Sequence, residues 1–129
     1  IDKKKMDNLK KNIVVISNKI SKNKILIFGP QKEFKVDPHQ FVGIHSNGKI
    51  INQKYFEEYK DLYELDKFLE KTFEIDMGIL YFSKIRELQS SNDNFFIVNN
   101  KFLYRNKDHW SAFGQRYYGN KINELYILE

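Results

Sequence analysis

Two short, continuous apolar runs constrain the fold more than any other feature of this sequence. They are KILIF at 24–28, closed by Gly29-Pro30, and GILYF at 78–82. A run of this kind, lacking polar alternation, predicts a strand that is covered on both faces, as in parallel sheets. A helical pattern precedes the first run, and a helix that leads into a buried strand is half of a βαβ unit. We therefore expect an α/β fold in which these two strands pair in parallel.

Apolar residues at helical spacing predict the helices that accompany these strands. The first covers roughly 6–21, the second roughly 52–73, and a short third helix follows the second strand at about 83–88. A last helix begins at Ser111, which is a favourable N-cap residue. Gly114 lies one turn into that helix, where a glycine costs stability, and it therefore indicates close packing.

The segments between these elements show the signals of turns. Residues 31–51 are predicted to form an irregular loop, and residues 90–94 a turn. The apolar segments 95–98 and 101–104 flank Asn99-Asn100, and asparagine tolerates the positive φ that a tight hairpin turn needs. We expect a β-hairpin there.

Length and composition indicate a globular chain. With 129 residues, 41% apolar and 30% charged, it fits a single domain or part of one. No apolar run approaches the roughly 20 residues of a membrane span, so the chain is expected to be soluble. The first residue is Ile1, with no initiator Met, and we expect the sequence to be a piece of a longer protein. The absence of cysteine excludes disulfides and thiolate sites.

The charge and the histidines do not predict a nucleic-acid or metal site. The net charge is +5, but nineteen of the 22 basic residues are Lys, whereas base and bidentate phosphate recognition favours Arg. An electrostatic binder of nucleic acid or another anionic polymer stays a weaker alternative. Asp37, His39 and His45 match no metal-ligand spacing, so we expect no metal and no cofactor.

The segment Tyr104–Gly114, YRNKDHWSAFG, carries the one chemical grouping in the sequence. A histidine such as His109 can take a proton from a hydroxyl nucleophile, while Asn106 or Asp108 could orient its ring. The other interpretation is structural, with Ser111 as a helix cap and His109 as a hydrogen-bonded surface residue. The segment contains no evident nucleophile.

This segment resembles the last motif block of SGNH hydrolase-like domains, especially those attached to membrane O-acyltransferases that modify bacterial surface polysaccharides. Three stretches fall into register with the family: KILIFGPQKEF at 24–34, GILYFSKIRELQ at 78–89 and NNKFLYRNKDHWS at 99–111. The resemblance covers the carboxyl-terminal half of such a domain. The family's Gly-Asp-Ser nucleophile block and its oxyanion-hole blocks have no counterpart in this sequence.

The matching block also departs from the family's pattern. Asn106 stands three residues before His109, where the family has the Asp that pairs with the histidine. Asp108 is adjacent to His109 in the chain, and neighbouring side chains rarely face one another, so Asp108 is not a self-evident replacement. Trp110 stands where Leu is usual, as in related alginate-type O-acetyltransferases.

The resemblance implies a three-layer, flavodoxin-like parallel sheet and serine acyl transfer or ester hydrolysis on a cell-surface carbohydrate, outside the cytoplasm. His109 would be the general base, Asn106 or Asp108 would orient it, and the nucleophilic serine would lie outside this chain. The expected partner is a carbohydrate or acyl-ester substrate, not nucleic acid. The competing hypothesis is a non-catalytic α/β domain that binds a glycan or a partner protein.

Overall fold

The computed structural model describes residues 2–38, 60–90 and 96–125. The chain divides into two compact units. Unit 1 comprises residues 1–30 and 60–84, and unit 2 comprises residues 31–59 and 85–129. Each unit is described separately.

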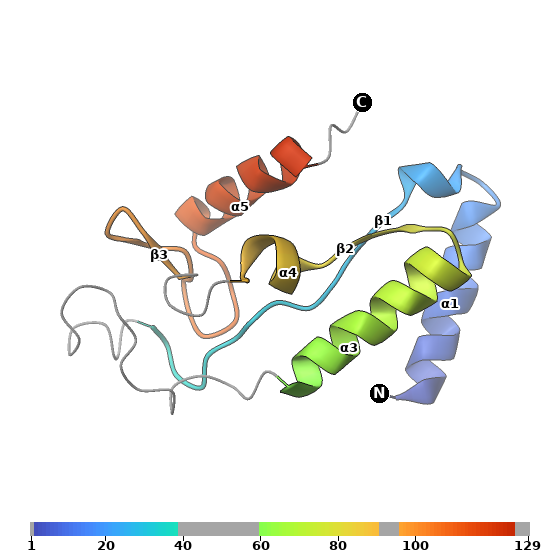
Figure 1. Ribbon diagram of the computed structural model, residues 1–129, viewed down its shortest axis with the longest axis horizontal. Coiled ribbons are helices and arrows are strands. Elements are labelled where there is room, and N and C mark those ends of the chain that lie inside the picture. The colour runs from blue at the N-terminus through green and yellow to red at the C-terminus, as the bar shows by residue number, and fades with distance from the viewer. Residues whose placement is uncertain (1, 39–59, 91–95, 126–129) are drawn as a thin grey trace. The chain divides into compact units, whose positions relative to one another are not determined.

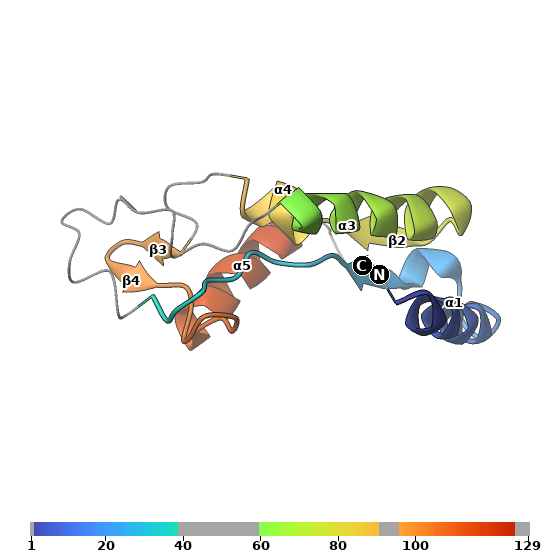
Figure 2. The ribbon, with the colours of Figure 1, turned by 90° about the horizontal axis from the view of Figure 1, so that it is seen from below.

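Unit 1 is built on a pair of parallel strands, β1 (Leu26–Phe28) and β2 (Leu80–Phe82), which lie side by side in Figures 1 and 2. Leu26 pairs with Leu80 and Phe28 with Phe82. The Gly29 N–H extends the ladder by donating to the Phe82 carbonyl oxygen at 2.8 Å. The predicted parallel pairing of the two apolar runs is therefore confirmed.

Three helical segments complete unit 1. Helix α1 (Lys3–Ser17) begins at the N-cap Asp2, whose carboxylate accepts the Lys5 N–H, and a 3₁₀ turn, η1 (Lys22–Lys24), leads into β1. Helix α3 (Lys60–Glu70) continues as a π-helix, η4 (Lys71–Asp76), before β2. The prediction of a helix at 52–73 is thus met from residue 60 onward, and its first residues lie outside the described part of the chain.

One face of the unit 1 sheet is packed and the other is partly open. Side chains alternate along a strand, so Ile27 and Tyr81 share one face while Phe28 and Leu80 lie on the opposite one. The first face contributes to a core formed by Ile13, Phe73, Ile79 and Tyr81, with Met6, Ile25, Ile27, Leu69 and Met77 packed against it. On the other face, Phe28 is 46% exposed and Leu80 37%. The expectation that both strands are covered on both faces is wrong for these two residues, although Phe82 on the same face is fully buried.

A buried carboxylate ties α3 to the end of β2. Asp66 Oδ1 accepts the Tyr81 hydroxyl at 2.7 Å, and Asp66 Oδ2 accepts the Ser83 hydroxyl at 2.6 Å. Asp66 is only 6% exposed, so these two bonds compensate for its lost hydration. A Cβ added to Gly29 would overlap Tyr81 Oη and Asp66 Oδ1, which explains the glycine at the end of β1. The sequence pattern gave no sign of this cluster.

Unit 2 contains a short helix, a hairpin and the last helix. Helix α4 (Lys84–Leu88), whose first residue belongs to unit 1, opens it, and β3 (Ile97–Val98) and β4 (Lys101–Phe102) pair antiparallel, as Figure 2 shows. Asn99 and Asn100 have φ of 50° and 59°, so the predicted hairpin with positive-φ asparagines is confirmed. The last helix, α5, spans Ala112–Leu125.

The core of unit 2 is aromatic. Phe34 packs edge-on against Phe96 and Tyr104, with ring centroids 5.3 and 5.2 Å apart, and Tyr118 lies against Trp110. Gly114 brings α5 close to the chain after β4, since an added Cβ would overlap the Leu103 carbonyl group. The close packing predicted at Gly114 is confirmed. The two sheets seen in the described residues have two strands each.

Candidate active site

The sequence around His109 forms a tight loop in unit 2. Tyr104 and Trp110 form an isolated antiparallel bridge, and residues 105–109 loop out between them. The Arg105 N–H donates to the His109 carbonyl oxygen at 2.8 Å, which closes the loop from within. The histidine is therefore presented by a short closed turn that directly precedes α5.

Two side-chain oxygens face the same ring nitrogen of His109. Its Nδ1 lies 3.0 Å from Asn106 Oδ1 and 2.8 Å from Asp108 Oδ1. Both oxygens are hydrogen-bond acceptors, so the arrangement requires a proton on Nδ1. In the neutral ring this leaves Nε2 as the unprotonated nitrogen. Asn106 and Asp108, the two residues predicted from the sequence to orient the ring, thus together favour the tautomer with the proton on Nδ1.

The orientation of the Asn106 amide is set by the backbone. Its Oδ1 accepts the His109 N–H at 2.9 Å and the Asp108 N–H at 3.2 Å, as well as facing the imidazole. Two N–H donors would repel an amide NH₂ group placed there, so the oxygen must point inward. Asn106 therefore organises the turn and orients the ring with one atom.

The contact of Asp108 with its chain neighbour corrects the sequence-based expectation that the two side chains would not face each other. In an extended strand, neighbouring side chains point to opposite faces. Here the chain curls between Asn106 and His109, and both side chains converge on one side. Asp108 supplies the carboxylate that the resemblance would place at position 106.

The side chain of His109 is largely exposed. The His109 side chain is 61% exposed and that of Asp108 is 37% exposed. Among the described residues, Nε2 has no hydrogen-bond partner. An ion pair at such exposure is weakened by water, so Asp108 acts chiefly as an acceptor that holds the tautomer. The ring is accessible to a substrate hydroxyl.

The segment 31–37 forms hydrogen bonds to the backbone of the histidine turn. Gln31 Nε2 donates to the Asp108 carbonyl oxygen at 2.6 Å, and the Phe34 N–H donates to the Lys107 carbonyl oxygen at 2.9 Å. Asp37 Oδ1 accepts the Lys107 N–H at 2.9 Å. The sequence analysis missed Gln31 and Asp37 as supports of the turn. The position of Gln31 just beyond the carboxyl end of a strand was the one available signal.

A buried polar network supports the base of the turn. The Tyr104 hydroxyl donates to the Lys32 carbonyl oxygen at 2.7 Å and accepts the Gln89 side-chain amide, while Gln89 Oε1 accepts the Lys32 N–H at 2.7 Å. Burial raises the pKa of Tyr104 well above its ordinary value, so the hydroxyl keeps its proton. The same loss of hydration lowers the pKa of Lys32.

Ser111 is a helix cap in this structure. Its hydroxyl accepts the Gly114 N–H at 2.9 Å and donates to the Phe102 carbonyl oxygen at 2.7 Å. With both roles of the hydroxyl used locally, the structure favours the cap over a nucleophile. The cap prediction for Ser111 is confirmed.

Asp37, His39 and His45 were the other residues considered from the sequence, as metal ligands. His39 and His45 lie outside the described residues, and Asp37 is engaged with the Lys107 N–H. In the part of the chain that the structure describes, no three His, Cys, Asp or Glu residues gather as metal ligands would. None of the described helices is both long and apolar enough to cross a bilayer.

Comparison with protein-family models, with curated proteins and with solved structures finds no match to this chain.

Proposed function

We propose that the chain is part of an SGNH-type domain that transfers or hydrolyses O-acyl, in particular acetyl, groups on a cell-surface carbohydrate outside the cytoplasm. One observation carries the proposal. The Nδ1 of His109 faces Asn106 Oδ1 and Asp108 Oδ1, and the side chain as a whole is 61% exposed, with no hydrogen-bond partner at Nε2 among the described residues. A general base needs this arrangement, with one nitrogen tied to an acceptor and the other able to receive a proton.

The proposed mechanism is acyl transfer through a serine that lies outside this chain. Nε2 of His109 takes the serine proton as the serine oxygen bonds to the acyl carbon, and gives it to the donor alcohol oxygen as that bond breaks. It then takes a proton from the acceptor hydroxyl, of a sugar or of water, as that oxygen bonds to the acyl carbon. The proton returns to the serine oxygen as the acyl–serine bond breaks. During these steps the Nδ1–H remains directed at Asn106 and Asp108. The carboxylate of Asp108 favours the imidazolium that forms, whereas the amide of Asn106 orients the ring without adding charge.

The fold proposed with this function is a larger α/β sheet of three layers. Parallel sheets are usually covered on both faces and contain several strands. The β1–β2 pair leaves Phe28 and Leu80 partly exposed, as a portion of such a sheet would. The strands that complete it would lie outside this chain.

A second candidate, a non-catalytic domain that binds a glycan or a partner protein, has its own supporting observation. Asn106 caps the turn and Ser111 caps α5, so both residues have structural tasks without any chemistry. In that case His109 would be a surface residue whose ring is held only by the turn.

The test compares variants of the histidine turn in the protein that also carries the serine. We expect His109→Ala to lower acyl transfer by roughly 10²–10⁴-fold, as for a lost acid–base group, and Asn106→Asp to preserve or raise activity. Lys107→Ala is the matched control, since the described contacts of this exposed residue use its backbone. An acetylated sugar is the suitable substrate, because free imidazole hydrolyses activated phenyl esters. Full activity of His109→Ala would favour the binding-domain candidate.

The 129-residue chain alone provides a complementary test. We expect no turnover of acetylated sugars, because no nucleophile block is present. In ¹⁵N-detected spectra of the histidine ring, the Nδ1–H tautomer should dominate at neutral and higher pH, and Asn106→Ala with Asp108→Ala should return the ring to the Nε2–H form favoured in free peptides. A ring that is unaffected by both substitutions would contradict the proposed positioning.

A further inference from the structure

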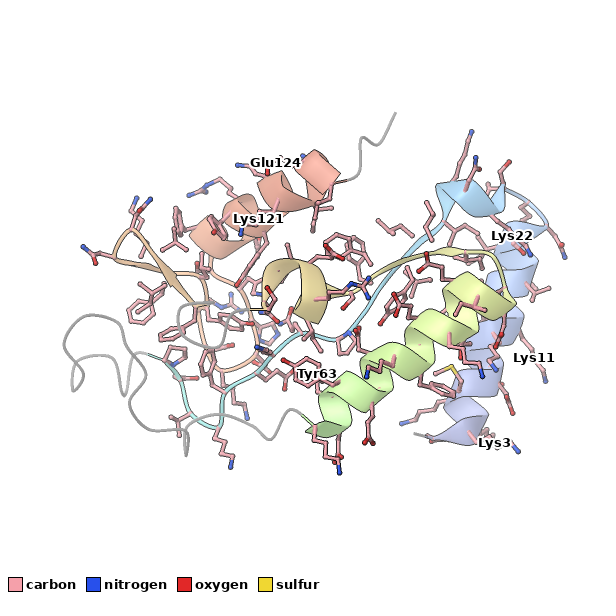
Figure 3. The ribbon with its side chains drawn as sticks, in the orientation of Figure 1. Lys3, Lys11, Lys22, Tyr63, Lys121 and Glu124 are labelled. Carbon is pink, nitrogen blue, oxygen red and sulfur yellow. The ribbon has the colours of Figure 1, made fainter. Side chains whose placement is uncertain are left out.

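Helix α1 and the turn after it concentrate the positive charge of the chain. Residues 2–24 contain eight lysines and two aspartates, a net charge of +6, whereas the whole chain carries +5. All other residues together are therefore slightly negative. Within the part of the chain that the structure describes, Lys5 alone among the α1 lysines has a carboxylate near it, Asp2 at 4.0 Å. Figure 3 shows Lys3 and Lys11 directed away from the ribbon, whereas Lys22 Nζ donates to the Met77 carbonyl oxygen at 2.8 Å.

The same segment also exposes large apolar side chains. Ile13 is the one residue of α1 that is buried, at 3% exposure. Five others are between 41% and 54% exposed: Leu9, Val14, Val15, Ile16 and Ile20. Only part of the apolar stripe predicted for this helix is thus used by the core of unit 1.

Charged and apolar side chains alternate around the exposed side of this segment. Lys11 lies one turn before Val15, and Lys19 lies one turn after it. Ile16 and Ile20 directly follow Val15 and Lys19 in the chain, and they too are one turn apart. A lysine can place its aliphatic stem along such apolar surface while its ammonium group reaches an anion.

We propose that the exposed side of α1, with Lys19 and Ile20, docks on an anionic lipid surface. Basic segments with exposed aliphatic residues bind in the headgroup region through apolar burial and attraction to anionic lipids. The charge argues against a second copy seated on the same surface, because two such helices would repel one another. This proposal is independent of His109 and of the acyl-transfer proposal.

Vesicle sedimentation of the full chain tests the charge part of the proposal. We expect binding to phosphatidylcholine vesicles that contain phosphatidylglycerol, little binding to phosphatidylcholine alone, and weakening as salt rises. Lys11→Gln with Lys19→Gln should reduce partitioning about thirtyfold, at about fivefold for each lysine. Lys60→Gln with Lys67→Gln, two exposed lysines of α3, is the matched control and should have little effect.

Substitution of exposed apolar residues by glutamine tests the apolar contribution to lipid binding. Ile16→Gln with Ile20→Gln should lower binding to the anionic vesicles at every salt concentration, whereas Leu125→Gln, exposed at 53% in unit 2, should not. Circular dichroism of each variant verifies that it is folded. Absence of binding, or equal loss in the control variants, would overturn the proposal. Self-association in analytical ultracentrifugation that the α1 substitutions abolish would assign this surface to a second copy instead.

Discussion

Units 1 and 2 differ in how completely they cover their apolar side chains. Of the eleven large hydrophobic residues that are exposed in the described part of the chain, ten belong to unit 1 and Leu125 alone to unit 2. Unit 2 instead buries Phe34, Phe96 and Tyr104 almost completely. Exposed apolar side chains mark contact sites where they gather into one contiguous patch. Among the described residues, large exposed apolar side chains therefore lie almost entirely in unit 1.

Polar groups contribute to this difference. In unit 2, Tyr104, Gln89 and the backbone of Lys32 form a buried network that fixes the aromatic core in one arrangement. In unit 1, the carboxylate of Asp66 hydrogen-bonds α3 to β2 and Ser83, whereas among the described residues no buried polar contact of this kind holds α1, which contributes Ile13 to the core. We therefore expect substitutions in unit 1 and unit 2 to change the stability of the chain by different amounts.

The largest expected effect is at Gly114 in unit 2. Gly114→Ala places a Cβ on the Leu103 carbonyl group, so either α5 or the preceding chain must move. We expect a loss of about 3 kcal/mol in unfolding free energy, at the upper end for overpacking, measured by urea denaturation.

Gly119→Ala provides the control on the same helix, because no atom lies within 4 Å of the added Cβ. It should stabilise the chain by about 0.5–1 kcal/mol through helix propensity. Equal effects of the two substitutions would show that α5 is not held against Leu103.

The next effect compares the buried hydroxyls of the two units. Tyr104→Phe leaves the Lys32 carbonyl and the Gln89 amide without the Tyr104 hydroxyl, and should cost about 2 kcal/mol. Tyr81→Phe removes one donor from Asp66, which retains the Ser83 hydroxyl, and should also destabilise the chain. We expect hydrogen exchange to increase around β3–β4 in the first variant and around β2 in the second. Increased exchange throughout the chain in both variants would show that the two units unfold together.

Much of the local structure could be predicted from the sequence, because its causes are local. The two apolar strands, the Asn99-Asn100 turn and the Ser111 cap each depend on residues close together in the chain. The parallel pairing needed only the additional fact that a helical pattern separates the two runs.

The supports of the candidate site were not predictable in the same way. Gln31 reaches the Asp108 carbonyl across 77 positions of the chain, and Asp37 reaches Lys107 across 70. No periodicity or spacing encodes such contacts. The Asp108–His109 contact was missed for a different reason: it depends on the curl of the loop, which the alternation rule for strands does not describe.

Alkaline pH provides a third comparison, since both tyrosines with clearly raised pKa values, Tyr104 and Tyr118, lie in unit 2. Below the ordinary pKa of 10.0, both are protonated in the folded and the unfolded chain, so they give no pH dependence. Above it, the unfolded chain releases these protons while the folded chain retains them. Stability should therefore fall by about 1.4 kcal/mol per pH unit for each tyrosine.

Tyr118→Phe should remove about half of this slope in urea denaturation above pH 10.0. Lys32, whose pKa burial lowers, acts in the opposite direction: stability rises with pH between its folded pKa and 10.5 and is constant above that. The slope is therefore best read above pH 10.5, where Lys32 no longer contributes. An unchanged slope in Tyr118→Phe would contradict the burial of its hydroxyl.

The smallest expected effect separates structure from chemistry at Ser111. Ser111→Ala removes the cap acceptor for the Gly114 N–H and the donor to the Phe102 carbonyl oxygen, and should cost about 1 kcal/mol. Ser111→Asp keeps an acceptor at the helix start and should recover part of the loss. Neither substitution should change acyl transfer by the protein that also carries the serine, because the hydroxyl is engaged within the fold and His109 needs no contact with it. A loss of activity far beyond the loss of folded protein, with Ser111→Asp equally inactive, would instead identify Ser111 as the nucleophile and place the whole chemistry within unit 2.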